Sequence, residues 1–240
     1  MKRIIIVGAT SGIGMEVAKL FLQHNYLVGI AGRRKERLDM LKNEFPENCF
    51  AEVIDVTQVS AAENFHKLIE QLGGMNIFLL CSGVGSENMT LNPEIELETA
   101  NTNAVGFMRM TTAAFNYFSQ NGGGQMAVIS SIAGTKGLGA APAYSATKRL
   151  QSIYIDALEQ QAKMRKLNIG FTDIRPGYVD TDLLKNRKYP LLMKPTKVAN
   201  TIFRVVVQKK RKIIIDWRYK ILVFFWKMIP NWLWKYLPIK

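Results

Sequence analysis

Cysteine, histidine and long apolar runs are scarce in this chain of 240 residues. Two cysteines, Cys49 and Cys81, are too few for a disulfide scaffold and lack the spacing of metal ligands, so we expect reduced thiols. The two histidines, His24 and His66, lie in helix-type segments and predict no metal site. Because no apolar run approaches the ~18–20 residues that cross a bilayer, we expect no membrane-spanning helix.

The amino-terminal apolar run ends after four residues (Ile4–Val7), short of the ~7–15 of a signal peptide. We therefore interpret it as a strand and expect a cytoplasmic protein. With 48% hydrophobic and 21% charged residues, the chain is predicted to fold throughout. Its length fits one large domain, because domains usually run ~50–250 residues.

Acidic residues are nearly absent from the last quarter of the chain. Residues 1–182 hold 17 Lys/Arg and 18 Asp/Glu, a net charge of −1. Residues 183–240 hold 15 Lys/Arg and a single acid, Asp216, a net charge of +14, together with all four tryptophans. The sequence therefore predicts a nearly neutral domain, residues 1–216, and a basic, aromatic tail, residues 217–240.

Two interpretations of this tail stay open. Tryptophan and tyrosine favour the headgroup zone of a bilayer, so the tail could contact the inner face of a membrane peripherally. Four cations of the tail would attract anionic lipid: Arg218, Lys220, Lys227 and Lys235. Alternatively, the tail packs on its own domain or on a partner subunit. The basic cluster 209–212 lacks any nucleic-acid-binding motif, so no nucleic-acid partner is predicted.

The hydrophobic pattern alternates between short strand-type and longer helix-type segments. Strands are predicted at 3–7, 27–31, 50–55, 76–81, 125–130, 168–174 and 212–216. Helices are predicted near 12–24, 34–45, 58–72, 97–119, 143–166 and 196–208. Several strands are apolar along both faces, which is typical of a parallel sheet covered on each side. We therefore expect a single α/β domain of the doubly wound, Rossmann type, with about seven parallel strands and its ligand at their carboxyl ends.

A glycine-rich turn, Gly8–Gly14, joins the first predicted strand to the first helix. Glycine allows a sharp turn and a close approach of phosphate, and the helix N-terminus offers free N–H groups. Ser11 adds a hydroxyl, and Ile13 lies between the last two glycines. The turn predicts a dinucleotide site, although its spacing differs from G-x-G-x-x-G and a purely packing role is the alternative.

Two arginines, Arg33 and Arg34, follow the second predicted strand, where an NAD-specific enzyme commonly places a carboxylate. A guanidinium can bind a ribose 2′-phosphate, so we expect NADP rather than NAD, with Arg33 as the main contact. The alternative is a solvated charged start of a helix. Asp55, which ends the third strand before Val56, could accept from the adenine amino group.

Tyr144 and Lys148 stand four residues apart at the start of a long helix-type segment, on one helical face. A nearby ammonium should lower the pKa of the phenol from ~10 and suit it to proton exchange with a carbonyl or alcohol oxygen. Ser131, at the end of the fifth predicted strand, could donate a hydrogen bond to the same oxygen.

With these motifs the chain resembles the short-chain dehydrogenase/reductases over roughly residues 3–182. The matching residues are the glycine triplet Gly8, Gly12 and Gly14, then Asp55, Val56, Gly83, Asn103, Ser131, Tyr144, Lys148 and the loop Pro176–Thr181. The resemblance implies catalytic Asn103, Ser131, Tyr144 and Lys148, with Asn103 helping to hold a proton-relay water. It also implies that Pro176, Gly177, Val179 and Thr181 meet the nicotinamide. Leu80, Cys81 and Ser82 stand before Gly83 where the family usually has two asparagines and an alanine, so two amide side chains are missing.

The activity that this resemblance implies is NADPH-dependent reduction of a small-molecule carbonyl, reversible as alcohol oxidation, with Tyr144 as general acid/base. A homodimer or homotetramer is the implied assembly. The segment 181–193 is expected to form a lid over an apolar substrate. Two alternatives remain: a membrane-surface reductase of a lipid-like ketone, and an inactive scaffold that binds the dinucleotide.

Overall fold

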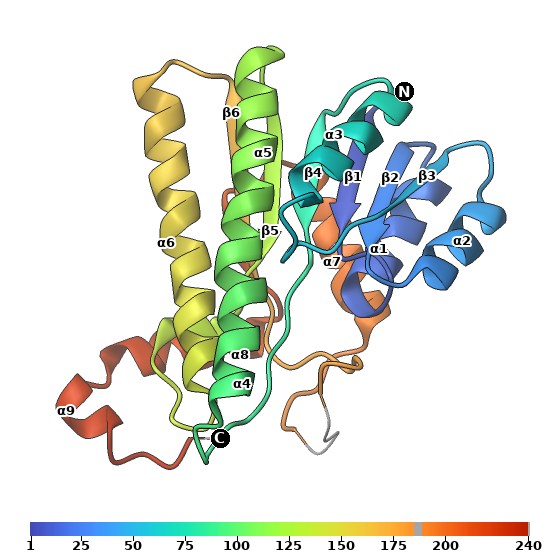
Figure 1. The fold of residues 1–240 in the computed structure, drawn as a ribbon. Helices are drawn as coiled ribbons and strands as arrows, with labels where there is room; N and C mark the ends of the chain where they lie inside the picture. Colours follow the sequence, from blue (N-terminus) through green and yellow to red (C-terminus); the bar gives the residue numbers. More distant parts are fainter. Residues whose placement is uncertain (185–188, 240) are drawn as a thin grey trace.

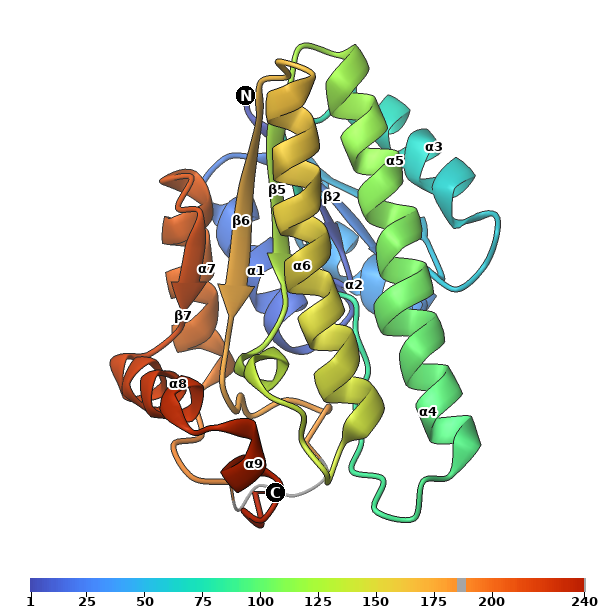
Figure 2. The same ribbon diagram turned by 90° about the vertical axis from the view of Figure 1, so that its left-hand side faces the viewer.

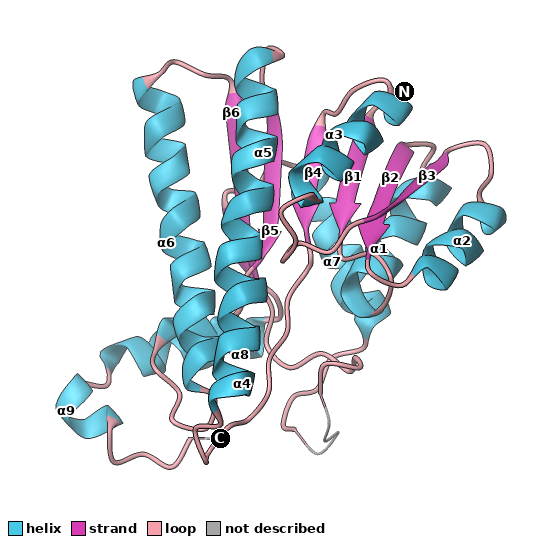
Figure 3. Cartoon of the chain, in the orientation of Figure 1, coloured by secondary structure: helices cyan, strands magenta, loops and turns pink. Residues whose placement is uncertain are grey.

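The structure is a computed structural model that describes residues 1–184 and 189–239. These residues contain one seven-stranded parallel sheet. The strands are β1 (Arg3–Val7), β2 (Leu27–Gly32), β3 (Cys49–Val53), β4 (Ile77–Leu80), β5 (Gly124–Ile129), β6 (Ile169–Arg175) and β7 (Lys212–Ile214). Their spatial order is β3-β2-β1-β4-β5-β6-β7, so the chain starts in the middle and winds outward in both directions (Figures 1 and 3). This arrangement confirms the predicted doubly wound α/β fold.

Helices cover both faces of the sheet (Figure 2). They are α1 (Gly12–Gln23), α2 (Lys35–Glu44), α3 (Ala61–Leu72), α4 (Pro93–Ala100), α5 (Phe107–Gln120), α6 (Pro142–Met164), α7 (Pro195–Val207), α8 (Trp217–Met228) and α9 (Asn231–Trp234). Buried residues of α1, α2, α7 and α8 form one hydrophobic cluster, and those of α3, α5 and α6 form the other. The sheet separates these two cores.

The first strand shows why the sheet is apolar on both faces. Ile4 and Ile6 belong to the core under α1 and α7, whereas Ile5 and Val7 belong to the core under α3 and α5. All four side chains are fully buried. Since side chains alternate between the faces of a strand, a continuous apolar run is what a sheet covered on both sides requires.

The structure does not have the single continuous α-helix that was predicted near 97–119. The structure has α4, then a π-helical segment η1 (Asn101–Gly106), then α5. A π-helical turn breaks the regular hydrogen-bond ladder, and such turns often occur at functional sites. A Cβ at Gly106 would lie 2.7 Å from Val56 Cγ2, so the backbone of η1 packs closely against the loop that follows β3.

The sequence pattern identified no helix beyond residue 208, but α8 follows β7 and packs on the sheet. Its Tyr219 and Val223 are 1% and 2% exposed and belong to the core beneath α1 and α7. A Cβ at Gly177 would lie 2.2 Å from Tyr219 Cζ, so the ring of Tyr219 occupies the space that any larger residue would need. No helix within residues 1–184 and 189–239 is both long and apolar enough to cross a membrane.

Candidate active site

A cavity of about 430 Å³ opens at the carboxyl ends of β1, β2, β3 and β4. Eleven residues expected to bind a cofactor line it: Gly8, Ser11, Gly12, Ile13, Gly14, Arg33, Arg34, Asp55, Val56, Gly83 and Thr181. Seven other expected site residues do not line it: Asn103, Ser131, Tyr144, Lys148, Pro176, Gly177 and Val179. Lys148 and Asn103 nevertheless adjoin the cavity, because a Cβ at Gly83 would lie 3.4 Å from Lys148 Nζ and 3.3 Å from Asn103 Oδ1.

The turn between β1 and α1 is a tight glycine cradle. Gly8 has a φ of +94°, and a Cβ there would lie 2.5 Å from Ser82 N. A Cβ at Gly14 would lie 2.1 Å from Gly8 O, so neither position accepts a side chain. Ser11 precedes α1 without capping it, and the first turn of α1 holds no acidic residue. The first N–H groups of α1 therefore face the cavity as donors for an anion.

Arg33 and Arg34 line the same cavity but have different contacts. Arg34 donates to Thr10 Oγ1 from Nε at 3.3 Å and from Nη2 at 3.2 Å, and its Nη1 lies 4.0 Å from Asp182 Oδ2. Arg33 makes no hydrogen bond or ion pair with residues 1–184 or 189–239. Arg33 is thus the guanidinium that is available to an anionic ligand.

Asp55 is held in its charged form beside these arginines. Its Oδ1 accepts hydrogen bonds from the backbone N–H and the hydroxyl of Thr57, at 3.0 and 2.8 Å. Burial acts to raise the pKa of Asp55, but the bonds from Thr57 and the charge of Arg33 outweigh it and hold that pKa below its usual value. The carboxylate is therefore a fixed hydrogen-bond acceptor at the cavity wall.

Tyr144 lies in the first turn of α6, with its ring on the backbone of the loop that follows β4. A Cβ at Gly85 would lie 2.4 Å from Tyr144 Cδ2. Ser131, two residues after the end of β5, lies close enough to the Tyr144 side chain to lower the pKa of the phenol, and its Oγ accepts from Ala133 N at 3.1 Å. The structure thus brings together two hydroxyl groups that come from different elements.

Lys148 is 5% exposed and points from α6 to the end of β5. Its Nζ donates to Ile129 O at 2.9 Å and to Gln151 Oε1 at 3.2 Å. Burial lowers the pKa of this ammonium to about 8, against the opposing effects of Cys81 and Asp173. At neutral pH Lys148 is therefore charged, but a rise of one or two pH units would remove its proton.

The expectation that Lys148 lowers the pKa of Tyr144 is wrong for this structure. Burial raises the pKa of Tyr144 above its ordinary value of 10, although the nearby hydroxyl of Ser131 acts in the opposite direction. Lys148 Nζ lies 5.7 Å from the ring centroid, and its charge does not outweigh the loss of water around the phenol. The tyrosine is consequently a proton donor at neutral pH.

Asn103 is completely buried in η1 and fastens this segment to the loop after β4. Its side chain accepts from Val84 N at 2.9 Å and donates to Val84 O at 2.6 Å and to Thr147 Oγ1 at 3.3 Å. Its backbone carbonyl accepts from Gln151 Nε2 at 2.9 Å. Asn103 is therefore linked to Lys148 through Gln151.

The loop after β6 reaches the site only at its ends. Pro176 O lies 3.5 Å from Ser131 Oγ, and Thr181 lines the cavity opposite Gly12. Between Pro176 and Thr181, Gly177 packs against the ring of Tyr219, and the buried Val179 forms a β-bridge with Met193. The predicted lid, 181–193, starts here; its residues 185–188 lie outside the described part of the chain.

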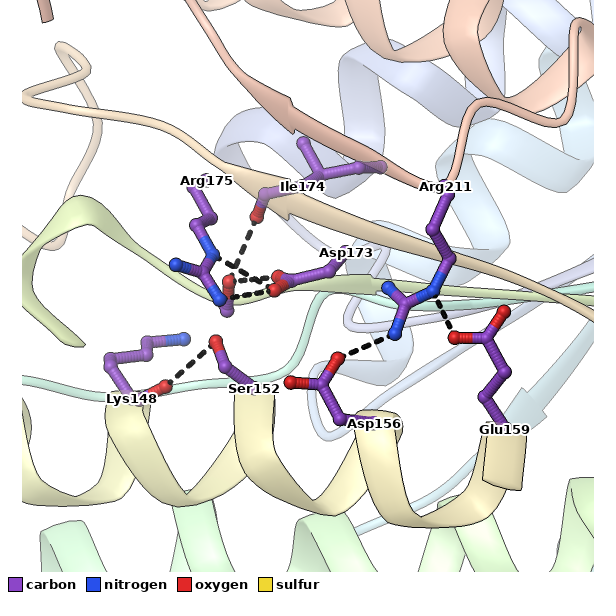
Figure 4. Close-up of polar contacts among 9 residues, drawn as sticks. Lys148, Ser152, Asp156, Glu159, Asp173, Ile174, Arg175 and Arg211 are labelled. Atoms are coloured by element: carbon purple, nitrogen blue, oxygen red, sulfur yellow. Dashed lines mark hydrogen bonds and ion pairs between the residues drawn. The ribbon is translucent and has the colours of Figure 1, made fainter. Parts of the chain in front are cut away.

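A buried ion pair stands behind Lys148, on β6 (Figure 4). Arg175 donates to Asp173 Oδ2 from Nε at 2.8 Å and from Nη2 at 2.7 Å, and the two side chains are 5% and 0% exposed. Ser130 donates to the other oxygen of Asp173. Each charge of the pair thus has a partner, which a buried charge requires.

Two features of the site were not predicted from the sequence. Gln151 is 1% exposed and joins Lys148 to Asn103; its position, three residues after Lys148 on the same helical face, is a signal that could have identified it. Thr10 could have been identified only from the structure, because its contact with Arg34 joins two separate loops.

Cys81 lines the cavity as a neutral thiol, since burial raises its pKa to about 12.

Comparisons with known proteins identify the family of the chain. The family model described as short chain dehydrogenase matches residues 2–190. An uncharacterized oxidoreductase of Staphylococcus haemolyticus is 30% identical over 210 residues, covering 85% of this chain and 90% of its own. Dehydrogenase/reductase SDR family member 7B of Xenopus tropicalis is 26% identical over 239 residues, covering 88% of this chain and 76% of its own.

Two solved structures share the fold. A short-chain type dehydrogenase/reductase from Mycobacterium ulcerans superposes with a TM-score of 0.80 at 21% identity, covering 90% of this chain and 88% of that chain. The closed form of a serine dehydrogenase complexed with NADP+ superposes with a TM-score of 0.79 at 24% identity, covering 88% of this chain and 92% of that chain. The chain belongs to the short-chain dehydrogenase/reductase family of oxidoreductases.

Proposed function

We propose that this protein reduces a small-molecule carbonyl compound with NADPH, and oxidises the corresponding alcohol in reverse. One observation carries the proposal: Tyr144 lies close enough to Ser131 for that hydroxyl to lower its pKa, and it stands beside the buried ammonium of Lys148, at the edge of a cavity built on a glycine cradle. An inactive scaffold has no need of a proton donor, a second hydroxyl and a buried cation in one place.

The cavity fits a dinucleotide that carries a 2′-phosphate. The uncapped start of α1 and the glycine cradle would hold the pyrophosphate, and Arg33 would bind the 2′-phosphate with Arg34 behind it. Asp55 would accept from the adenine amino group. The other contacts that we propose are Val56 and Gly83 toward the adenosine, and Lys148, Pro176 and Thr181 toward the nicotinamide half, with Gly177 and Val179 holding the loop between Pro176 and Thr181 in place. The related fold of serine dehydrogenase complexed with NADP+ supports the choice of cofactor.

The chain's own residues supply the proton and its placement. NADPH, when bound, supplies the hydride that adds to the carbonyl carbon. Tyr144 donates its phenolic proton to the carbonyl oxygen; its raised pKa keeps that proton in place at neutral pH. Ser131 donates a hydrogen bond to the same oxygen as negative charge develops there. Lys148 stabilises the phenolate that remains, and Asn103 positions Lys148 through Gln151.

We also propose that residues 1–216 carry the NADP-binding oxidoreductase site, with Tyr219 and Val223 of α8 completing its core, and that the chain assembles as a homodimer or homotetramer. Support comes from α6, whose Ile153 is 52% exposed on the outer face of the site helix. Light scattering on the purified protein gives the mass that decides the assembly.

A panel of ketones and aldehydes, followed by loss of NADPH absorbance, tests the reaction. We expect turnover with at least one compound, and a loss of roughly 10²- to 10⁴-fold in kcat for Tyr144→Phe, as is typical when a general acid is removed. The variant should still bind NADPH, because the phenyl ring keeps its packing on Gly85. Equal turnover by both proteins would refute the role of Tyr144, and binding of NADPH without turnover on any carbonyl would favour a scaffold.

A further inference from the structure

Helix α8 carries apolar side chains on two opposite faces. Its inner face places Tyr219 and Val223 in the core. Four residues that recur every three or four positions form an outer stripe and are 48–67% exposed: Trp217, Ile221, Phe224 and Met228. A surface helix normally opposes its buried stripe with polar residues. The core therefore accounts for only one of the two stripes.

The outer stripe is exposed although the segment is firmly attached. Tyr219 Oη accepts from Tyr178 N at 3.1 Å, which fixes α8 to the loop after β6. Lys136 Nζ donates to Ile229 O at 2.8 Å, and Trp234 Nε1 donates at 2.7 Å to a backbone carbonyl in the loop that holds Lys136. These contacts hold α8 and α9 with their apolar outer side facing away from the domain.

Further exposed aromatic residues lie in α8 and beyond it. Phe225, Trp232 and Tyr236 are 57%, 68% and 72% exposed. Together with the outer stripe and with Lys220, Lys227 and Lys235, they make up what we call the α8–α9 surface. Tryptophan and tyrosine are the residues that concentrate where a membrane meets water, because their rings are apolar and each carries a polar group.

The charge of this surface has one sign. Residues 217–240 contain five Lys/Arg and no acid. Arg218 is paired with Asp216, at 2.8 Å. Lys220, Lys227 and Lys235 form no ion pair with any acid of residues 1–184 or 189–239. At 100° per residue, Lys220 and Lys227 fall on one flank of the outer stripe, so the cations border the apolar side chains.

We propose that the α8–α9 surface docks on an anionic lipid bilayer. The outer stripe would enter the boundary between headgroups and acyl chains, and the flanking lysines would meet the lipid phosphates. A second copy of the chain fits less well, because a two-fold interface would set this surface against itself and bring lysines against lysines. The docking does not depend on the reaction proposed above.

The position of α8 and α9 gives the docking a consequence for the site. Both helices lie at the carboxyl end of the sheet, the edge toward which the β6 arrow points in Figure 2. The cavity and the Tyr144–Ser131 pair lie at the same edge. Docking would therefore hold the edge that carries the site next to the bilayer.

Flotation of the full chain with vesicles tests the docking. We expect the protein to float with vesicles of equal parts phosphatidylglycerol and phosphatidylcholine, far less with phosphatidylcholine alone, and less as salt is added. Ile221→Gln/Phe224→Gln should abolish flotation. Lys220→Glu/Lys227→Glu should weaken it roughly 25-fold or more, since one lysine near an anionic surface is worth about fivefold in affinity.

Two control variants carry matched changes elsewhere on the surface. Met40→Gln/Met164→Gln replaces exposed apolar residues of α2 and α6 (65% and 77% exposed), and Lys42→Glu/Lys163→Glu reverses two exposed charges. Both should float like the wild type. Turnover of NADPH with a water-soluble carbonyl, measured without lipid, should be unchanged in all four variants, so failure of the docking and failure of the proposed reaction are distinguishable.

Two outcomes would overturn the proposal. One is absence of flotation by the wild type, or equal flotation by the wild type and Ile221→Gln/Phe224→Gln. The other is a lower assembly mass for Ile221→Gln/Phe224→Gln than for the wild type, measured by light scattering, while the two proteins float equally with vesicles. The α8–α9 surface would then be a contact between copies of the chain.

Discussion

Gln151 accepts a hydrogen bond from Lys148 Nζ at 3.2 Å, one turn further along α6. Its amide nitrogen donates to Asn103 O at 2.9 Å, so one side chain joins the buried cation to the π-helical segment. The side chain of Gln151 is itself 1% exposed. It can therefore set both the position and the charge of Lys148 without contacting the reacting atoms.

Gln151→Leu should slow the reaction because Lys148 loses an acceptor in a buried site. We expect a fall in kcat of roughly tenfold or more, given that a hydrogen bond to a charged group is worth about 1.5–3 kcal/mol. The pKa of Lys148 should also fall further, because the acceptor stabilises the charged form. The alkaline limb of the pH–rate profile should thus move to lower pH.

Gln151→Glu is the informative companion, since a carboxylate beside the ammonium favours the charged form of Lys148. The alkaline limb should then move to higher pH. A role of Gln151 in packing alone would change kcat in both variants but leave the limb at the same pH.

The pH dependence of the wild type follows from Lys148. Burial lowers its pKa to about 8, so the ammonium is present below that pH and is lost above it. Carbonyl reduction should accordingly be constant near neutral pH and decline as the pH rises through about 8. The pH profile of kcat/KM measures this directly, because it reports the free enzyme. A profile that stays flat to pH 10 would contradict the role given to Lys148.

Arg33→Ala should change the choice of cofactor. We expect the KM for NADPH to rise roughly 10- to 100-fold, because a charge-assisted contact to phosphate is worth about 1.5–3 kcal/mol and each 1.4 kcal/mol is tenfold. The KM for NADH should change little, since NADH has no 2′-phosphate. Arg37→Ala is the control, because Arg37 is exposed on α2 and does not line the cavity. Equal rises for both cofactors would refute the assignment of Arg33.

The two ion-pair groups in Figure 4 should differ in their effect on stability. Arg175→Met leaves Asp173 charged and fully buried without its ion-pair partner, which should lower the free energy of unfolding by about 3–5 kcal/mol. Arg211→Met removes contacts to Asp156 and Glu159, which are about a third to a half exposed, and should cost about 1 kcal/mol or less. Urea denaturation of both variants measures the difference. Similar losses would show that burial does not determine the contribution of these pairs.

The sheet and most helices were predictable because their apolar pattern reports directly on burial. Predicted strand 3–7 matches β1 in both bounds, and β7 was recognised although it has only three residues. Helix α8 escaped prediction for a physical reason: apolar side chains lie on two of its faces, so no single periodic stripe marks it as a surface helix.

The residues of the site were predictable from spacing, but their electrostatics were not. The spacing of Tyr144 and Lys148 places them on one face of α6, yet the effect of Lys148 on the phenol depends on a distance and on burial. Likewise, the link from Lys148 to Asn103 runs through a backbone carbonyl of the π-helical segment, and no sequence pattern of that stretch indicated this segment.

Transfer of deuterium tests the central claim most directly. NADPH carrying deuterium at both positions of C4 of the nicotinamide is incubated with the protein and an accepted ketone, and the alcohol is examined by mass spectrometry and NMR. We predict one deuterium on the carbinol carbon with the wild type, and almost no labelled alcohol with Tyr144→Phe although that variant binds NADPH. Alcohol without deuterium, or equal labelling by the two proteins, would contradict hydride transfer assisted by a proton from Tyr144.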